Sequence, residues 1–132
     1  MKVLLQLSSL ALLLMIFGCN SEEEEITVLD VNVQNITGTW ELTESYVSPG
    51  GETEWRPVKN GNIYTFFDNG KFSSSGRQNC SEGEFTLEDN ILQLDCEEEH
   101  LSWRVDTLGS RVMILGGIGC IEACLYKYKR ID

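Results

Sequence analysis

The sequence predicts an all-β domain, a small eight-stranded antiparallel up-and-down barrel. The first observation behind this prediction is that residues 26–132 lack helical periodicity, whereas short runs rich in Val, Ile, Thr, Tyr, Phe and Trp recur at intervals of about 8–12 residues. The second is that turn residues separate neighbouring runs closely, which is typical of consecutive hairpins. A chain of 132 residues has room for one modest domain of this kind.

The eight expected strands follow one another along the chain. Their ranges are 38–47, 62–67, 71–75, 82–87, 91–95, 100–106, 111–115 and 125–131. Asn69-Gly70 lies between two aromatic runs and predicts a tight hairpin turn in which both residues take a positive φ. Residues 88–90 and 108–110 are expected to connect their neighbours similarly, so the strands form an up-and-down meander.

Alternation along the strands predicts which side chains face inward. We expect a mostly aromatic and aliphatic set to line the barrel and to contact a ligand: Trp40, Leu42, Tyr46, Phe66, Phe72, Phe85, Leu94, Trp103, Tyr126 and Tyr128. Glu44 falls on the same face as Leu42, where a carboxylate without a partner is costly. Two interpretations of Glu44 stay open, a polar ligand contact inside the barrel or a strand-end carboxylate in solvent. Trp55 and Arg56, in the long loop 48–62, are candidates for a lid over the open end.

Four of the five cysteines, Cys80, Cys96, Cys120 and Cys124, fall within the predicted barrel. An even number in a small exported domain predicts two disulfides, for which three pairings exist. The expected hairpins favour Cys80 with Cys96 and Cys120 with Cys124, because each pair lies on neighbouring segments. A four-thiolate metal site is the alternative, but the sequence lacks the paired Cys-x2–4-Cys spacing on both sides. We therefore expect no metal.

The first 18 residues have the pattern of an export signal. Lys2 precedes an apolar run that is too short to span a membrane. Residues 16–19 end in Gly18-Cys19 and resemble a bacterial lipobox, the sequence at which diacylglycerol is added to the cysteine and the chain is cleaved before it. The resemblance implies that Cys19 is the lipid attachment site and that the protein contacts the membrane through this anchor. An ordinary secretory signal with a chance cysteine is the alternative.

A short acidic segment follows Cys19. Four consecutive glutamates, residues 22–25, are typical of a solvated tether. A serine and an acidic run directly behind the lipidated cysteine also resemble the export signal by which lipoproteins of the Bacteroidota reach the outer face of the outer membrane. We expect a surface-exposed outer-membrane protein, with the periplasmic leaflet as the alternative. The chain then divides into a cleaved signal (1–18), a lipidated cysteine with a flexible acidic tether (19–35) and the barrel (36–132).

Charge and motif content exclude several functions. Asp+Glu number 21 against 10 Lys+Arg, a formal net charge of −11, and no basic cluster is present, so nucleic acid is not expected as a partner. The sequence contains no nucleophile with a nearby base, no Gly-rich phosphate loop and no metal-ligand set. We expect no catalytic residue and no cofactor. His100, the only histidine, follows three glutamates and is expected in a solvated loop rather than in an acid–base or metal site.

The two ends of the predicted barrel carry a family resemblance. Gly38-Thr39-Trp40 opens the first strand and Arg130 lies in the last. With the meander between them, this pattern resembles the lipocalins and the wider calycin barrels, in which the tryptophan of Gly-x-Trp sits at the closed end and an arginine packs over its ring. The resemblance covers about residues 36–131 and implies that Gly38, Trp40 and Arg130 close the barrel. Together with the lipobox, it is similar to the lipocalin-like domains of Bacteroidota lipoproteins.

This resemblance implies a function. We expect a cell-envelope lipoprotein whose barrel binds a small hydrophobic or amphipathic ligand. An eight-stranded barrel either holds one small ligand or fills its interior with side chains. The alternative is therefore a non-enzymatic interaction or accessory module, a filled barrel displayed on the outer membrane for a protein partner.

Overall fold

A computed structural model describes residue 18 and residues 26–132 of the chain. The predicted signal segment (apart from residue 18), the lipid attachment site Cys19 and the acidic run 22–25 lie outside the described residues. Within the described residues, no helix has the length and apolar character needed to cross a membrane.

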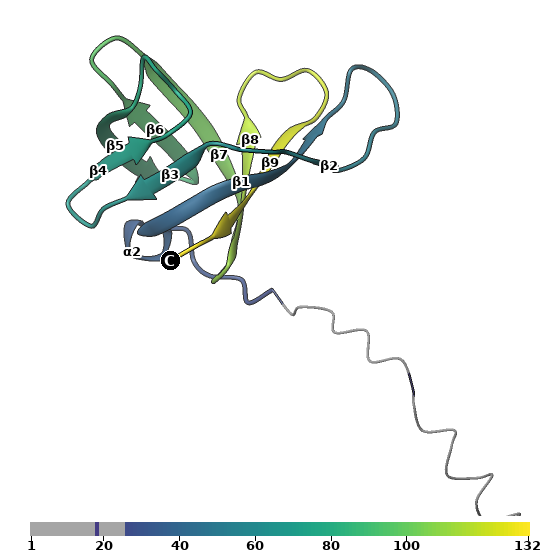
Figure 1. The fold of residues 1–132 in the computed structure, drawn as a ribbon, viewed down its shortest axis with the longest axis horizontal. Coiled ribbons are helices and arrows are strands. Elements are labelled where there is room, and N and C mark those ends of the chain that lie inside the picture. The colour runs from purple at the N-terminus through teal and green to yellow at the C-terminus, as the bar shows by residue number, and fades with distance from the viewer. Residues whose placement is uncertain (1–17, 19–25) are drawn as a thin grey trace, which may run out of the picture.

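Nine strands and one short helix make up the described chain (Figure 1). The strands are β1 (Gly38–Val47), β2 (Arg56–Pro57), β3 (Ile63–Phe66), β4 (Lys71–Ser74), β5 (Glu82–Glu88), β6 (Ile91–Asp95), β7 (His100–Leu108), β8 (Val112–Gly117) and β9 (Cys124–Arg130), and the helix is α2 (Val33–Ile36). The eight-stranded meander predicted from the sequence is confirmed. The two-residue strand β2 was not predicted, because a pair of residues in a long loop carries no periodicity.

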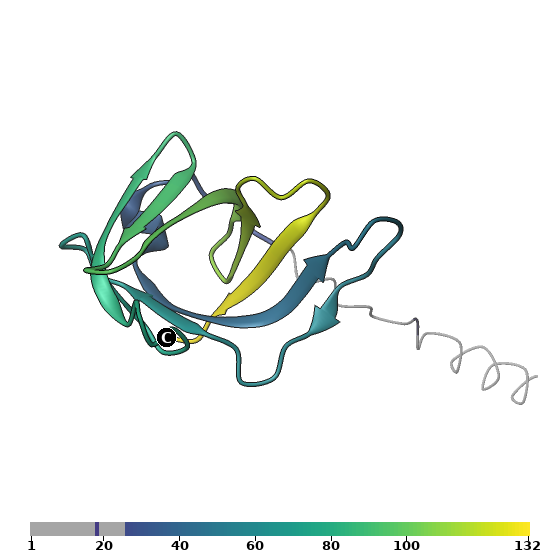
Figure 2. The same cartoon turned by 90° about the horizontal axis from the view of Figure 1, so that it is seen from above.

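The sheet closes on itself. The strand order is β1-β3-β4-β5-β6-β7-β8-β9, and β9 returns to pair with β1, so eight antiparallel strands form a closed barrel. Strand β2 pairs with β1 only at Glu44 and Ser45, where β1 extends beyond β3. Figure 2 shows β1 and β9 reaching past the rest of the barrel side by side. Closure leaves the eight strands without an unpaired edge.

Because consecutive strands run in opposite directions, the connections gather at two ends of the barrel. The closed end carries α2, the turn after β3 and the C-terminus, which lie together in Figure 1. The open end carries the loops after β1, β4, β6 and β8. The chain joins the closed end before residue 36, since Leu29 N donates to Leu108 O (2.8 Å) and Val28 forms a bridge with Gly109. Contacts with the barrel thus begin within the segment predicted to be a tether.

Side chains fill the closed end and the middle of the barrel. The buried cluster comprises Ile36, Trp40, Tyr64, Phe66, Phe72, Cys80, Phe85, Leu92, Leu94, Cys96, Val105, Leu108, Met113, Leu115 and Tyr128. The rings of Phe66 and Phe85 have centroids 5.1 Å apart, and those of Tyr64 and Tyr128 are 5.5 Å apart, distances typical of packed aromatic pairs. The side chains that point inward from these strands therefore form a packed core in this part of the barrel.

The β3–β4 hairpin turn differs from the predicted geometry. In the β3–β4 turn only Gly70 has a positive φ (81°), so the prediction of positive φ at both Asn69 and Gly70 is wrong. Gly70 N donates to Phe67 O and Phe67 N to Lys71 O, which is the pattern of a longer hairpin loop ending in a left-handed glycine. The β5–β6 turn is the one with two positive φ values, at Asp89 (51°) and Asn90 (63°).

Candidate functional site

Trp40 and Arg130 seal the closed end of the barrel. The Trp40 side chain is fully buried, its Nε1 donates to Ile36 O (2.9 Å), and the Arg130 guanidinium carbon lies 4.3 Å from the centroid of its ring. Gly38 has a φ of 138°, and a Cβ at this position would overlap Arg130 Nη1. Glycine is therefore needed here both for the backbone conformation and for the close approach of the guanidinium.

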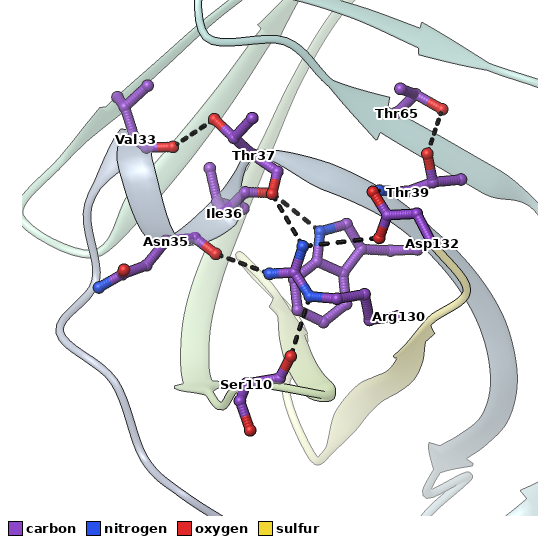
Figure 3. A network of polar contacts seen from close by, with 10 residues as sticks. Val33, Asn35, Ile36, Thr37, Thr39, Thr65, Ser110, Arg130 and Asp132 are labelled. Carbon is purple, nitrogen blue, oxygen red and sulfur yellow. Dashed lines mark hydrogen bonds and ion pairs between the residues drawn. The ribbon is translucent and has the colours of Figure 1, made fainter.

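The Arg130 guanidinium joins β9 to two other chain segments (Figure 3). Its nitrogens donate to the backbone carbonyls of Thr37 (2.9 Å), Asn35 (3.0 Å) and Ser110 (2.9 Å), and Asp132 lies 3.6 Å from Nη1. These carbonyls come from the end of α2 and from the β7–β8 turn, which no sequence periodicity brings together. Since the donors of Trp40 and Arg130 already have acceptors, the closed end has a structural role.

The expected ligand lining divides into two groups. Six of its members lie in the packed core with at most 5% of their surface exposed: Trp40, Phe66, Phe72, Phe85, Leu94 and Tyr128. Leu42, Trp103 and Tyr126 are only partly buried and pack against this core. These three side chains are therefore more accessible to solvent than the six core side chains.

Glu44 and Tyr46 do not follow the strict alternation predicted for the first strand. Leu42 is opposite Tyr128 in β9, but Glu44 is opposite Lys127, so one extra residue, Thr43, forms a bulge in β1. The bulge reverses the faces beyond it. The prediction that Tyr46 shares the inward face of Leu42 is therefore wrong, as is the inward interpretation of Glu44, and both side chains lie on the outer face with Lys127.

An ion pair and aromatic contacts form on that outer face. Lys127 Nζ lies 2.9 Å from Glu44 Oε2 and 4.3 Å from the centroid of the Trp55 ring, and the Tyr46 and Trp55 ring centroids are 5.5 Å apart. Trp55, a candidate for a lid, thus packs on the outside of β1 and β9 instead of over the mouth. Arg56 lies beside it in β2 and is exposed.

The open end contains a depression of about 400 Å³. Its walls come from β7, from the end of β8 with the following loop, from the start of β9 and from the β4–β5 loop: Arg77, Leu101, Ser102, Trp103, Gly117, Ile118, Gly119, Cys120, Cys124 and Tyr126. The rings of Trp103 and Tyr126 meet edge to face with centroids 5.4 Å apart. Gly117 lies opposite Trp103 in the β7–β8 register and has no side chain to fill the space. Of this lining, only Trp103 and Tyr126 were predicted to contact a ligand.

Polar groups gather beneath the depression. Among the described residues, Trp103 Nε1 is buried and has no hydrogen-bond partner of good geometry. The Tyr64 hydroxyl lies close to this N–H and to the Arg77 guanidinium. Burial raises the pKa of Tyr64 above its ordinary value, and the nearby Arg77 guanidinium and Trp103 N–H act in the opposite direction. Burial also raises the pKa of Tyr128, as does its proximity to Tyr64, so both phenols remain neutral near pH 7.

Arg77 reaches this region from the loop between β4 and β5. Its Nη1 lies 3.4 Å from Glu99 Oε1, and both side chains are about one-third exposed. Sequence reasoning missed Arg77 because a single arginine in a Gly/Ser/Asn-rich loop carries no positional signal. Its place in the site depends on the loop folding back over the barrel mouth.

Both disulfides lie at the open end. Cys80 pairs with Cys96 (Cα–Cα 5.4 Å) beyond the ends of β5 and β6, and Cys120 pairs with Cys124 (Cα–Cα 6.1 Å) across the β8–β9 loop. This is the pairing that the hairpins favoured. The first disulfide is buried, and the second forms part of the depression wall, so the rim of the mouth is covalently held.

A second depression lies on the outside of β4 and β5. Its volume is about 700 Å³, and its walls are mainly polar or charged: Phe67, Asn69, Lys71, Phe72, Ser73, Glu82, Gly83, Glu84 and Glu97. It is the larger of the two. However, its outward carboxylates are solvated side chains, and no buried polar group without a partner is found among the described residues that line it. The open-end depression is therefore the better candidate site.

His100 lies at the start of β7, where its Nδ1 is 2.6 Å from Asp95 Oδ1 and most of its side chain is exposed. Within residues 26–132, no group of three or more His, Cys, Asp or Glu side chains is arranged to hold a metal ion. The strand-end pairing gives His100 a solvated hydrogen-bond partner.

A closed antiparallel barrel of eight strands, with one end sealed by an arginine over a tryptophan and the other end open, defines the class of calycin-like β-barrels. The lipocalin-like domain family matches residues 36–115, more than half of the chain, and the chain belongs to this family. The match includes Gly38 and Trp40 and ends before β9, which carries Arg130. No match is found among curated proteins or among solved structures.

Proposed function

We propose that the protein binds a small hydrophobic or amphipathic ligand at the open end of the barrel. The observation that carries this proposal is the depression of about 400 Å³ beside the partly exposed Trp103 and Tyr126. Ligand sites typically enclose roughly 300–1,000 Å³ and combine apolar walls with a few polar groups. Since the core below the depression is packed, the ligand occupies the mouth rather than the centre of the barrel.

The proposal includes a lipid anchor at Cys19 and display at the surface of the outer membrane. The lipobox-like residues 16–19 and the acidic run behind them support it. A Cys19→Ser variant is expected to lose incorporation of an alkyne-labelled fatty acid, which the unaltered protein retains. Digestion of the protein by an added protease on intact cells supports surface display, and protection contradicts it.

Binding is tested by fluorescence titration with 1-anilinonaphthalene-8-sulfonate, a dye with an apolar body. We expect a saturable increase in dye fluorescence that fits one site and is strongly reduced in Trp103→Ala. The matched control is Trp55→Ala, which removes an aromatic ring from the outer face and should leave the titration unchanged. A flat titration with folded protein contradicts the proposal.

The packed core and the apolar rim also favour a second function, a protein-interaction module. Ile121 is 98% exposed and Ile118 is 53% exposed, and both lie in the β8–β9 loop held by Cys120–Cys124. A rigid loop that presents two isoleucines is a candidate contact for a protein partner. Chemical crosslinking on cells distinguishes the two functions. A protein-interaction module is expected to yield one discrete crosslinked species that Ile121→Ser abolishes. The purified module is also expected not to bind the dye.

A further inference from the structure

We infer that the closed end of the barrel lies against the lipid surface of the membrane that holds the Cys19 anchor, so that the open mouth faces away from that membrane. This inference rests on the proposed lipid anchor and adds to it a contact surface and an orientation. The surface, here called the closed-end patch, consists of exposed aliphatic and aromatic side chains: Ile26, Val28, Val33, Phe67 and Ile131.

The exposed large hydrophobic side chains of the described residues lie at the two ends of the barrel. Three of them, Val47, Ile118 and Ile121, belong to the open end, and the other five form the closed-end patch. Each patch residue has between 37% and 70% of its surface exposed. A group of exposed apolar side chains on an otherwise polar surface marks a contact with a protein or with a membrane.

The chain joins the barrel at this patch. Val28 forms a bridge with Gly109, and Ser110 N donates to Thr27 O (3.1 Å). Ile26 lies beside the same turn, since a Cβ on Gly109 would be 3.0 Å from Ile26 Cγ2. The segment that leads toward the anchor is thus fastened to the β7–β8 turn, and its two exposed aliphatic side chains have a fixed place at the closed end.

The stretch of chain between this point and the anchor is short. Six residues, 20–25, separate Cys19 from Ile26, so the two are at most about 25 Å apart. Strand β1 has 10 residues, and strands that rise about 3.3 Å per residue and tilt by about 35–45° give a barrel roughly 25 Å tall. The mouth would reach the bilayer only with those six residues fully extended along the barrel wall. The closed end reaches it without extension.

The contact is apolar rather than electrostatic. The chain has a net charge of −11 and four consecutive glutamates at 22–25, whereas attraction to anionic head groups requires clusters of Lys or Arg. Aliphatic side chains that enter the boundary between head groups and acyl chains leave water whatever the charge of the lipid. A bilayer that the anchor keeps within reach therefore covers the patch. The mouth and Ile121 then remain open to the surrounding medium, from which a ligand enters.

The test measures how close each end of the barrel lies to a bilayer. The lipidated protein is purified from cells and reconstituted in phosphatidylcholine vesicles that contain a rhodamine head-group lipid. A donor dye is attached through Asp89→Cys in the β5–β6 turn (the closed-end label) or through Glu52→Cys in the loop after β1 (the open-end label), and both positions are exposed. We expect more energy transfer from the closed-end label, because the barrel separates the two labels by roughly 25 Å.

Patch variants separate membrane contact from tethering alone. Val28→Ser/Ile131→Ser should lower the transfer from the closed-end label, since serine gains little by leaving water. Val28→Ser alone keeps the backbone bridge with Gly109 and should give a smaller decrease. The matched control is Ile121→Ser, which removes a more exposed isoleucine at the open end and should leave the transfer from both labels unchanged. Retained dye binding at the mouth shows that each variant is folded.

Equal transfer from the two labels overturns the inference and leaves the anchor standing. Transfer from the closed-end label that Val28→Ser/Ile131→Ser does not lower also overturns it. If the same double variant converts a dimer into a monomer in sedimentation of the detergent-solubilised protein, a second copy covers the patch and the inference is wrong. If the unaltered protein incorporates no labelled fatty acid, the proposed anchor falls and the inference falls with it.

Discussion

At the scale of single residues, Arg130 and Trp40 show how one cation organises an end of the barrel. The guanidinium lies over a fully buried ring and its nitrogens bond three backbone carbonyls from two segments. The cation–π contact contributes about 0.5–2 kcal/mol, and each hydrogen bond to these exposed or partly buried carbonyls contributes about 0.5–1.5 kcal/mol. The side chain therefore holds α2 and the β7–β8 turn against the barrel.

Substituting Arg130 tests this role. Arg130→Met is expected to lower the free energy of unfolding by about 3 kcal/mol, because methionine retains much of the apolar stem and loses every donor. Urea unfolding followed by tryptophan fluorescence measures the change. Arg111→Met is the control, with an expected change within about 0.5 kcal/mol. If Arg130→Met lowers the free energy of unfolding no more than Arg111→Met does, the structural role assigned to Arg130 is contradicted.

The buried phenols beneath the mouth predict an alkaline instability. Burial raises the pKa values of Tyr64 and Tyr128 in the folded protein above the unfolded value of 10.0. A raised folded pKa contributes stability that is complete below about pH 10 and is lost as the pH rises toward the folded pKa. The free energy of unfolding should fall above about pH 10 by roughly 1.4 kcal/mol per pH unit for each of the two tyrosines.

Tyrosinate absorbance at 295 nm provides the measurement, combined with urea unfolding between pH 9 and pH 12. The absorbance of Tyr64 and Tyr128 should appear together with loss of the folded signal. The Tyr64→Phe and Tyr128→Phe variants should each show a shallower decline in stability above pH 10. A decline equally steep in both variants would contradict the assigned cause.

At the scale of secondary-structure elements, the bulge in β1 decides which side chains face the barrel. Alternation would have directed Glu44 inward, but the extra residue Thr43 brings it opposite Lys127 on the outer face. A bulge of this kind adds no recognisable signal to the sequence, since Thr43 fits a regular strand equally well. The position of the bulge is set by the pairing of β1 with β9, a strand more than 80 residues away in the sequence.

The outward position of Glu44 gives a clear prediction. Glu44→Gln is expected to lower the free energy of unfolding by less than about 1 kcal/mol, because its pair with Lys127 is partly exposed. Dye binding at the open end should not change. A double-mutant cycle with Lys127→Met measures the coupling energy between the two side chains, expected at about 0.2–1 kcal/mol. A loss of dye affinity in Glu44→Gln would place this carboxylate in the binding site after all.

At the scale of the whole molecule, the barrel combines a sealed end held by hydrogen bonds with an open end held by disulfides. Cys80–Cys96 encloses a loop with a sequence separation of 16, and Cys120–Cys124 one of 4. The chain-entropy account assigns about 3 kcal/mol to a loop of the first size and about 2 kcal/mol to the second. The second disulfide also forms part of the depression wall.

Removing the disulfides one at a time separates stability from binding. The Cys80→Ser/Cys96→Ser double variant is expected to lose about 3 kcal/mol of unfolding free energy and to retain dye binding under conditions where it remains folded. The Cys120→Ser/Cys124→Ser double variant should lose about 2 kcal/mol and bind the dye more weakly. Urea unfolding and dye titration measure the two effects. If the Cys80→Ser/Cys96→Ser variant loses dye binding and the Cys120→Ser/Cys124→Ser variant retains it, the proposed place of the second disulfide in the binding site is contradicted.

Much of the fold could be predicted because its information is local. Each of the eight barrel strands follows from a short run of β-branched and aromatic residues, and the disulfide pairing follows from which hairpin each cysteine flanks. The seal formed by Gly38, Trp40 and Arg130 was implied by family resemblance. The candidate site was predicted far less completely, since only Trp103 and Tyr126 of the expected lining border the depression at the mouth.

The sequence by itself determined the class of fold, the order of the strands and the charge of the molecule, since each depends on neighbouring residues or on composition. Only the tertiary structure decided where a ligand can bind. The β1–β9 pairing set the bulge that turns Glu44 outward, aromatic packing filled the barrel below the mouth, and the β4–β5 loop placed Arg77 beside Trp103. These features depend on contacts between distant segments, whose register and depth of packing are absent from any local pattern.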